Sequence, residues 1–369
     1  MKVLVAVDAY QGIMSSYDAN RYVEEAVASQ IEGADIVQVP LFNGRHELLE
    51  ATLTWHSGTQ YQIDVHDAQM RPVTATYGQT DTGLTVIEAS QFLTADVSLT
   101  QQTSYGLGEM INAALNQGAK HLAISVGGTR VFDGGAGMLQ ALGVHFYDDD
   151  GEEVDMRQGV GQMKRVRHID VSELRDDLYD ARIQILSDFD SHLYGKKSEV
   201  LQRYKEIGIT REAAVEIDNL LWYFSELFKS NLRIALVPIE RGGAGGGIAA
   251  ISKALLGAEI VTSHILVDQI MDLEQLVQQA DLIIFGEGLN EQDQLIETSS
   301  LRIAELAQQY DKKSIAICGT TDKFAQFEAL DVTGMFNTFI EMPKTYTDFK
   351  LGIQLRNYTI QAIKLLLTK

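Results

Sequence analysis

The segment from His121 to Gly143 has the residue types of a loop that binds an anion. The apolar run Leu122–Val126 predicts a strand and the apolar spacing after Gly137 predicts a helix, so a glycine-rich loop joins them. Glycines let main-chain N–H groups approach a ligand closely, and a helix N-terminus favours negative charge. The alternative is a tight turn in which Asp133 only caps the helix. The candidate anion-binding residues of this loop are Gly127, Gly128, Arg130, Asp133, Gly134 and Gly135.

Further glycine-bearing segments follow other predicted strands. In open α/β sheets, ligands bind beyond the carboxyl ends of the strands. We therefore expect these loops to converge on one cleft that binds a phosphorylated or carboxylated small molecule; each loop by itself is equally compatible with an ordinary turn. The segments are Asp8–Gly12, Asn43–Gly44, Gly242–Gly247 and Gly286–Gly288.

The elements that position these loops alternate between strand and helix. Short apolar runs without period-two alternation predict buried parallel strands, and helical patterns lie between many of them, which indicates an α/β fold. The predicted strands are Val3–Val7, Ile36–Val39, Leu122–Val126, Ile234–Val237, Leu282–Phe285, Ser314–Ile317 and Met335–Ile340. The predicted helices are Ala19–Ser29, Met138–Leu142, Gly247–Leu256, Ser300–Tyr310 and the strongly amphipathic Arg211–Lys229.

The two ends of the chain predict one domain and the middle predicts an insertion. Strands from both ends make a five-stranded doubly wound parallel sheet, so we assign residues 1–58 and 270–369 to a flavodoxin-like α/β domain. Residues 59–269 then form a second, inserted α/β domain, whose early part, Tyr61–Val86, alternates like antiparallel hairpins. The polar stretch Lys196–Lys205 predicts a mobile segment.

The composition limits the classes of partner and the compartment. A net charge of −21 argues against nucleic acid or an anionic membrane surface as the main partner. The single cysteine, Cys318, is expected to be a buried strand residue in a reducing compartment. There is no apolar run long enough for a signal peptide or a membrane span, so we expect a cytoplasmic protein. No metal-binding motif or Walker-type loop is present, and the oligomeric state stays open, a homo-oligomer included.

Several of these motifs, taken in order, resemble the type 1 glycerate kinase family. They are DAYQG, VPLFNG, TSYGLGEMI, GGTRVFDGGAGMLQALG, LVPIERGGAGGGIAA, LLGAE and ADLIIFGEG. The resemblance runs over nearly the whole chain, and TSYGLGEMI and DGGAGMLQALG are close to the family's wording. It implies an ATP-dependent kinase of D-glycerate that uses Mg²⁺, with a small anionic substrate bound in an interdomain cleft. It also implies a flavodoxin-like domain interrupted by a second α/β domain.

The chain departs from the family's usual motifs at several loops. Gln11 stands where the family has a lysine, Asn43–Leu48 reads NGRHEL for D-G-G-E-G-T, and Thr129–Phe132 reads TRVF for S-A-T-N. After Gly286–Gly288 the chain has Leu289, Glu291 and Glu297-Thr298 in place of the family's R-x-D and G-K. Of D-V-x-N-P-L it keeps only Asp188 and Leu193. Phosphoryl transfer depends on cations that neutralise the moving group, so these losses bear on activity.

Three arginines beside glycine loops suggest an altered anion site. Arg45, Arg130 and Arg241 each flank a loop that should face the cleft, and arginine binds carboxylate or phosphate through two hydrogen bonds. We hypothesise that they rebuild the anion site for a different ligand. The alternative is that all three are exposed loop arginines.

Two functional hypotheses follow from the resemblance. In the first, the protein phosphorylates glycerate or a related hydroxy acid, with Asp188 as the base and Asp8 as a second catalytic carboxylate. Gly245 and Gly246, with the loop after Val126, would then hold phosphates, and Glu287 would contact substrate or phosphate. In the second, the protein is an inactive paralogue that binds a small anion or nucleotide and regulates, and the retained carboxylates only cap loops.

Overall fold

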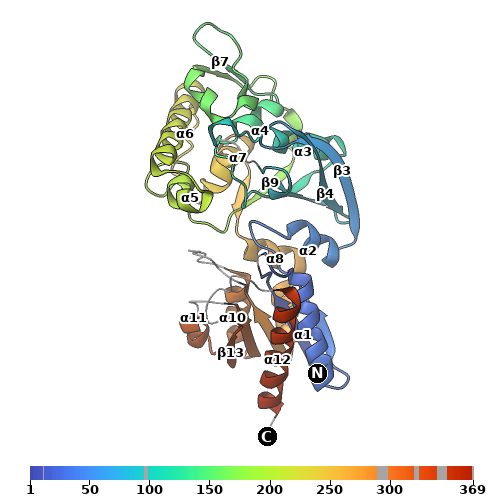
Figure 1. Cartoon of the computed structure of the whole chain (residues 1–369). Helices are drawn as coiled ribbons and strands as arrows, with labels where there is room; N and C mark the ends of the chain where they lie inside the picture. The colour runs from blue at the N-terminus through green and yellow to red at the C-terminus, as the bar shows by residue number, and fades with distance from the viewer. Residues whose placement is uncertain (11, 95–98, 289–297, 320–323, 339–346, 368–369) are drawn as a thin grey trace. The chain divides into compact units, whose positions relative to one another are not determined.

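The protein is described from a computed structural model that covers residues 1–369 except 11, 95–98, 289–297, 320–323, 339–346 and 368–369. The chain divides into two compact units, each described here by itself (Figure 1). Unit 1 comprises Met1–Asn43, Glu50–Trp55 and Ser263–Lys369. Unit 2 comprises Gly44–Leu49 and His56–Thr262, so it is inserted in the sequence of unit 1. The domain boundaries expected at 58/59 and 269/270 stay a prediction.

Unit 1 contains the predicted five-stranded parallel sheet, in the order β13-β12-β11-β1-β2. The chain leaves β1 toward β2 on one side and leaves β11 toward β12 on the other, which is the flavodoxin-like order. The carboxyl ends of β1 and β11 therefore form the topological switch point, where such sheets bind ligands. The strands are β1 (Lys2–Val7), β2 (Asp35–Gln38), β11 (Leu282–Gly286), β12 (Lys313–Cys318) and β13 (Gly334–Asn337).

Helix α1 (Ser16–Gln30) packs on this sheet through apolar residues and through buried polar side chains, among them Asn20. Asn20, in α1, accepts a hydrogen bond from the amide of Val7 (2.8 Å) and donates one to the carbonyl of Val39 (3.0 Å). This side chain fastens α1 to the ends of two neighbouring strands. The buried Cys318 ends β12, as expected. The helices of unit 1 are α1 (Ser16–Gln30), α8 (Ser263–Met271), α9 (Leu273–Gln279), α10 (Ser299–Gln309), α11 (Phe324–Ala329) and α12 (Asp348–Leu367), and α2 (Leu48–Trp55) begins in unit 2 and ends in unit 1.

Unit 2 is built on a mixed sheet in the order β10-β9-β6-β5-β4-β3. Strands β3 to β5 pair antiparallel, which confirms the predicted hairpins, and β5, β6, β9 and β10 pair parallel. A small antiparallel pair, β7 with β8, lies apart from this sheet. The strands are β3 (Gly58–His66), β4 (Pro72–Thr80), β5 (Leu84–Glu88), β6 (His121–Ser125), β7 (His145–Tyr147), β8 (His168–Asp170), β9 (Arg182–Leu186) and β10 (Glu259–Val261).

Two expectations about local structure are wrong. Ile234–Val237 is not a strand. Only Leu236 in this run is buried, and Pro238, directly after it, has no main-chain N–H to donate. The edge position of the sheet, next to β9, is occupied by β10 instead. Lys196–Lys205 is not a mobile polar segment, because it folds into most of helix α5 (Glu199–Ile207). Positions 339 and 340 of the last predicted strand lie outside the described residues.

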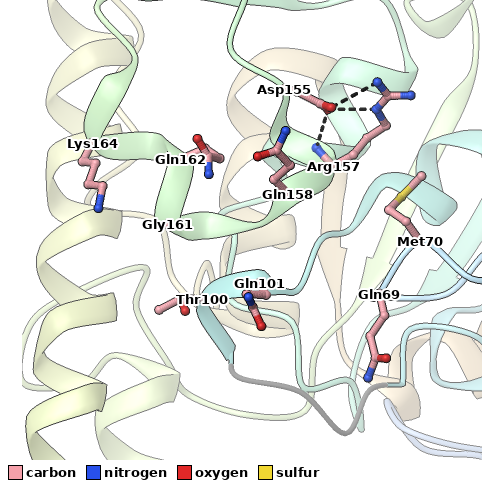
Figure 2. A pocket seen from close by; sticks show the side chains of 10 residues that line it. All are labelled: Gln69, Met70, Thr100, Gln101, Asp155, Arg157, Gln158, Gly161, Gln162 and Lys164. Atoms are coloured by element: carbon pink, nitrogen blue, oxygen red, sulfur yellow. Dashed lines mark hydrogen bonds and ion pairs between the residues drawn. The ribbon is translucent and has the colours of Figure 1, made fainter.

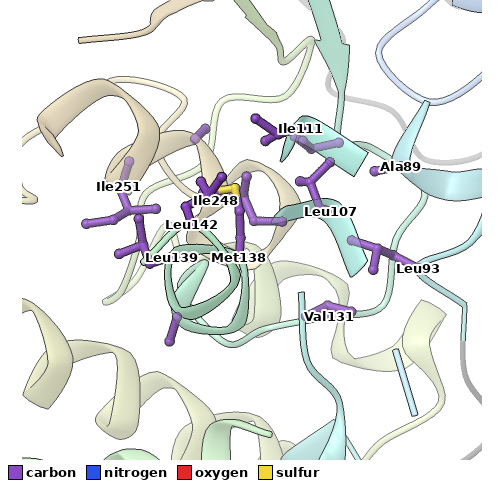
Figure 3. Packing of buried hydrophobic residues seen from close by; sticks show 14 of the residues in the cluster. Ala89, Leu93, Leu107, Ile111, Val131, Met138, Leu139, Leu142, Ile248 and Ile251 are labelled. Atoms are coloured by element: carbon purple, nitrogen blue, oxygen red, sulfur yellow. The ribbon is translucent and has the colours of Figure 1, made fainter. Parts of the chain in front are cut away.

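The core of unit 2 lies where short helices meet over the sheet. Met138, Leu139 and Leu142 from the α4 segment pack with Leu107 and Ile111 of α3 and with Ile248 and Ile251 of α7 (Figure 3). The amphipathic helix α6 (Arg211–Leu232) lies beside α5 (Figure 1). It buries one apolar face, made of Ala214, Ile217, Leu221, Phe224, Leu227 and Phe228. The helices of unit 2 are α3 (Tyr105–Asn116), α4 (Ala136–Ala141), α5, α6 (Arg211–Leu232) and α7 (Ile248–Leu256).

Candidate functional site

Gly44 joins two loops at the carboxyl edge of the parallel strands of unit 2. Its carbonyl accepts hydrogen bonds from the amide of Gly127 (2.9 Å) and the hydroxyl of Ser125 (2.7 Å), after β6. Its amide donates a 2.6 Å hydrogen bond to Oδ2 of Asp188, after β9. A Cβ on Gly127 would lie 2.4 Å from the Gly44 carbonyl oxygen, so only glycine permits this approach. The contacts bring Asp188 to the loop that the sequence singles out.

Glu88, at the end of β5, fixes the same segment from the other side. Its side chain is 8% exposed, and its two carboxylate oxygens accept hydrogen bonds of 3.1 Å from the amides of Glu47 and Leu49. The Ser90 hydroxyl donates to the carbonyl of Arg45 at 3.0 Å. Sequence reasoning missed Glu88, since β5 was hidden in an alternating segment. These bonds hold Arg45 and His46 on a fixed backbone.

The first half of the glycine-rich loop leaves main-chain donors available. The amides of Gly128, Thr129 and Arg130 donate no hydrogen bond to any group in the described part of the chain. Gly128 has φ +76°, which glycine adopts without strain. A Cβ on Gly128 would lie 3.5 Å from the His46 ring and 3.7 Å from Cβ of Arg45. Consecutive main-chain N–H groups of this kind are suited to bind an anion.

The second half of the loop is bonded internally. Asp133 is fully buried, and its carboxylate accepts hydrogen bonds from the amides of Ser104, Gly135 and Gly137 and from the Ser104 hydroxyl. Burial raises the pKa of this carboxyl, and the four donors oppose that rise. The amide of Gly134 donates to the carbonyl of Gly246 at 3.0 Å. The contacts of Asp133, Gly134 and Gly135 therefore lie inside the protein, and the predicted ligand role of these residues stays a prediction.

The second glycine loop of unit 2 is packed against the first. Gly245 and Gly246 have φ of +62° and +63°, and a Cβ on Gly246 would lie 2.1 Å from the carbonyl oxygen of Val131. The amide of Gly246 donates to Oε2 of Glu199 at 3.1 Å. This bond occupies the Gly246 amide, which the sequence assigns to phosphate, so the phosphate role of Gly245 and Gly246 stays a prediction.

Two of the three predicted arginines approach the same end of α5. Arg130 donates to the carbonyl of Ile207 at 2.6 Å, and Nη1 of Arg45 lies 3.9 Å from Oε1 of Glu206. The third, Arg241, lies near Asp190 instead. The Lys197 ammonium is the main cause of the lowered pKa of Asp190, and His192 and Arg241 lower it further. The structure therefore places Arg45 and Arg130 by the first glycine loop and Arg241 by Asp190.

Helix α5 carries a buried ion-pair chain that sequence reasoning missed. Arg203, only 9% exposed, pairs with Glu199 one turn before it and with Glu206 at 2.9 Å. Burial opposes the charge of Arg203, but the two carboxylates outweigh it and raise the pKa of the guanidinium. The i,i+4 and i,i+3 spacing of these residues was the available signal.

The His46 ring lies against the first glycine loop, 3.5 Å from the position of a Cβ on Gly128. Burial, with the Arg45 charge as a smaller cause, lowers the pKa of its imidazole. His46 is therefore expected to be neutral at pH 7, so it adds hydrogen-bonding capacity without charge.

Unit 1 holds a second pair of predicted carboxylates at its switch point. The amide of Asp8, after β1, donates to the carbonyl of Gly286, the last residue of β11, at 2.9 Å. Glu287 is 3% exposed and accepts a 3.1 Å hydrogen bond from the Thr298 hydroxyl. Both carboxylates are close enough to Tyr10 to add to the rise in its pKa, which burial dominates. Asp8 and Glu287 thus flank one edge; Gln11 and residues 289–297 lie outside the described residues.

A polar surface pocket of about 660 Å³ lies elsewhere in unit 2 (Figure 2). Asp155 there accepts two hydrogen bonds from the Arg157 guanidinium, at 2.8 and 3.1 Å. None of the predicted site residues lines this pocket. Within the described residues, no group of three metal-ligating side chains is present and no helix is long and apolar enough to cross a membrane.

Comparison with known proteins decides the family. The sequence model of the glycerate kinase family matches residues 3–357 of this chain. The chain belongs to the glycerate kinase family. Glycerate 2-kinase of Escherichia coli K12 is 29% identical over 327 residues, which cover 87% of this chain and 85% of that protein. Glycerate kinase of Bacillus subtilis 168 is 30% identical over 330 residues, which cover 88% of this chain and 86% of that protein.

A solved structure supports the assignment of this chain to the glycerate kinase family. The crystal structure of a protein described provisionally as glycerate kinase 2, from Salmonella typhimurium LT2, matches with a TM-score of 0.85 at 25% identity. The match covers 99% of this chain and 98% of that one. The chain therefore shares its α/β fold, a flavodoxin-like sheet interrupted by a second α/β unit, with that solved structure over nearly the whole length of both chains.

Proposed function

We propose that this protein transfers the γ-phosphoryl group of ATP to a hydroxyl of D-glycerate or of a closely related small hydroxy acid. Membership of the glycerate kinase family and the names of the relatives support this activity. The observation that carries the proposal is local to unit 2. Asp188 shares Gly44 with the loop whose Gly128–Arg130 amides remain available for an anion.

Asp188 is the proposed general base. Its Oδ2 is held by the Gly44 amide, so the carboxylate has a fixed position at the end of β9. It would accept the proton of the substrate hydroxyl as that oxygen forms its bond to the γ-phosphorus and ADP leaves with the bridging oxygen. A positioned base of this kind contributes about 10²–10⁴-fold to a rate. Asp8, in unit 1, is proposed as a second catalytic carboxylate. Glu287, at the same switch point, is proposed to contact substrate or phosphate.

The anionic parts of the substrates need donors and cations. The three available amides fit a carboxylate or phosphate because they supply N–H donors. Arg45, whose stem lies against the start of the same loop, adds a positive charge to this segment. Mg²⁺, which ATP carries, neutralises phosphate charge and usually takes only one or two protein carboxylates. Asp8 and Glu287 offer such oxygens, and the sequence departure at Gln11 makes this contribution more important.

A non-catalytic anion-binding role is the second candidate. The observation that favours it is that Arg130 donates to the Ile207 carbonyl, so this guanidinium group already has a partner within the chain. Together with Gln11, it leaves fewer cations for phosphoryl transfer. In this case the same loop would bind the ligand without turnover.

Two measurements separate these functions. ADP release, coupled to a spectrophotometric assay, is recorded with ATP–Mg²⁺ and D-glycerate, and the product is identified by ³¹P NMR. Turnover at roughly 1–100 s⁻¹ supports the kinase. A rise in unfolding temperature with D-glycerate or ATP–Mg²⁺, without turnover, supports the binding protein. Neither turnover nor a thermal shift contradicts both functions.

A further inference from the structure

We infer that the polar pocket of unit 2 shown in Figure 2 is a second ligand-binding site, for a small molecule that carries two anionic groups and at least one hydroxyl. The inference goes beyond the proposed function, because none of the predicted site residues lines this pocket. Its volume of about 660 Å³ falls in the range of small-molecule sites, roughly 300–1,000 Å³. Its described walls come from residues 69–70, 100–101 and 155–164.

The walls of the pocket are fixed against one another. Gly159 has φ +91°, and a Cβ on it would lie 2.5 Å from the carbonyl carbon of Gln101, so the second and third walls are in contact. The amide of Thr103, just after the second wall, donates to the carbonyl of Ala68, just before the first, at 3.0 Å. The pocket is therefore formed before a ligand binds, which lowers the ordering cost of binding.

The carboxylate of the pocket is already bonded. Asp155 is the one carboxylate among the described residues that line it. It accepts hydrogen bonds from the Arg157 amide (3.0 Å) and from Nε and Nη2 of the Arg157 guanidinium (2.8 and 3.1 Å). The guanidinium bonds are the main cause of the lowered pKa of Asp155. A carboxylate with three donors has little to offer a cationic ligand, so the pocket favours an anion.

Arg157 is held in place but keeps donors for a ligand. Its guanidinium carbon lies 5.9 Å from the ring centre of Tyr105, within the range of a cation–π contact. In the part of the chain that the structure describes, its Nη1 donates no hydrogen bond. The bonds to Asp155 are the main cause of its raised pKa, and Glu153, which pairs with His145 at 2.9 Å, is a minor one. Arg157 therefore presents N–H donors from a fixed position.

Lys164 supplies a second cation, well separated from the first. Arg157 and Lys164 lie at opposite sides of the pocket in Figure 2. Lys164 forms no ion pair with a carboxylate of the described residues, and the nearby Asp148 pairs with Arg165 instead, at 2.9 Å. Two separated cations suit a ligand with two separated anionic groups better than a ligand with one.

Glutamine side chains supply most of the remaining polar groups of the pocket. Four of them line it, Gln69, Gln101, Gln158 and Gln162. An amide side chain has both donor and acceptor atoms, as a hydroxyl group has, so the two pair well. A phosphorylated hydroxy acid combines a phosphate, a carboxylate and a hydroxyl, and is the class of ligand that uses all these groups. The product of the proposed function belongs to this class, but binding here does not depend on that reaction.

The test follows a methyl group inside the pocket of the full-length protein. Methionine methyls are labelled with ¹³C, and the signal of Met70, which lines the pocket, is assigned by its loss in Met70→Leu. Two probes are titrated, 3-phospho-D-glycerate and glycerol 3-phosphate, which lacks the carboxylate. Lys164→Gln is compared with Lys253→Gln, the matched control, because Lys253 is an exposed lysine on α7 that does not line the pocket.

The expected result is a saturable shift of the Met70 signal with 3-phospho-D-glycerate. The midpoint for glycerol 3-phosphate is about tenfold higher, the size expected for the loss of one hydrogen bond to a charged group. Lys164→Gln raises the midpoint for 3-phospho-D-glycerate by about the same factor, and Lys253→Gln leaves it unchanged.

Three outcomes overturn the inference. They are a Met70 signal that does not move with millimolar 3-phospho-D-glycerate, equal midpoints for the two probes, and a midpoint that Lys164→Gln does not change. If Lys164→Gln does not fold, the two probes on the wild type still decide. Failure of the proposed function looks different: no ADP is released with D-glycerate, while the Met70 shift and its dependence on Lys164 persist.

Discussion

The carboxylate of Asp188 accepts a 2.6 Å hydrogen bond from the main-chain amide of Gly44, which lies 144 positions earlier in the chain. The carbonyl of the same glycine accepts the amide of Gly127, so one residue connects the proposed base to the loop with available amides. A side chain at position 44 would meet Asp188 Oδ2 at 3.1 Å. The junction explains why the altered Asn43–Leu48 segment keeps a glycine at position 44.

The packing of the two glycine loops predicts a large loss of stability on one substitution. In Gly246→Ala the new Cβ would lie 2.1 Å from the Val131 carbonyl oxygen and 2.5 Å from Cα of Phe132, so the backbone must shift. Gly208→Ala is the control, because Gly208 also has positive φ but has no atom within 4 Å of the added Cβ.

We expect Gly208→Ala to lower the free energy of unfolding by about 1–2 kcal/mol, the cost of the left-handed conformation for an L-residue. Gly246→Ala should lower it by at least about 3 kcal/mol, since backbone strain is added. Urea unfolding followed by circular dichroism measures both. Equal losses in the two variants would show that the loops do not pack in this way.

The bonding of Asp133 predicts a structural cost at a residue that sequence reasoning assigned to a ligand. Asp133→Asn replaces one acceptor oxygen with an NH₂ group that faces N–H or O–H donors, so at least one buried hydrogen bond is lost. The free energy of unfolding should fall by about 1–3 kcal/mol. Asp150→Asn, at an exposed turn, should change it by less than about 0.5 kcal/mol. A stable Asp133→Asn protein that has lost ligand binding would instead favour a binding role.

The contacts of His145, which is none of the predicted site residues, predict that the stability of the protein depends on pH. Its two ring nitrogens lie 2.9 Å from Glu153 and 3.1 Å from Glu173, and hydrogen bonds to these carboxylates raise its pKa. A raised pKa in the folded state means that the contribution is fully present below the unfolded value, about 6.5, and is lost as the pH rises through the folded value.

Urea unfolding of the wild type and of His145→Gln at pH 6 and pH 9 tests this sign. The wild type should exceed the variant in unfolding free energy by more at pH 6 than at pH 9. A difference that is constant, or that grows with pH, would show that these carboxylates do not stabilise the imidazolium form.

Strand and glycine patterns were sufficient for the architecture. Short apolar runs such as Leu282–Phe285 predict buried parallel strands because both faces of such a strand are covered. They locate the five strands of unit 1, and the alternation in Tyr61–Val86 locates the hairpins of unit 2. The run Ile234–Val237 misleads, since its hydrophobicity does not show that only Leu236 is buried; Pro238, which follows directly and has no main-chain N–H, was the signal against a strand.

The site was harder to predict because its key contacts join distant segments. Local sequence shows that Arg45 and Arg130 flank glycines, but it does not show that both reach the end of α5. The same holds for Glu88 and Glu199, whose partners are main-chain amides with no sequence signature. The polar composition of 196–205 concealed a helix that is fixed by buried ion pairs.

Steady-state kinetics of Asp188→Asn with ATP–Mg²⁺ and D-glycerate test the central claim most directly. Asparagine keeps the shape and an oxygen for the Gly44 amide but cannot accept the hydroxyl proton. The account predicts a fall in kcat of about 10²–10⁴-fold with a KM for D-glycerate within about threefold of the wild type. Asp190→Asn, which removes the charge that pairs with Lys197 and that His192 and Arg241 also act on, should keep kcat. An active wild type together with an Asp188→Asn variant of undiminished kcat would contradict the account.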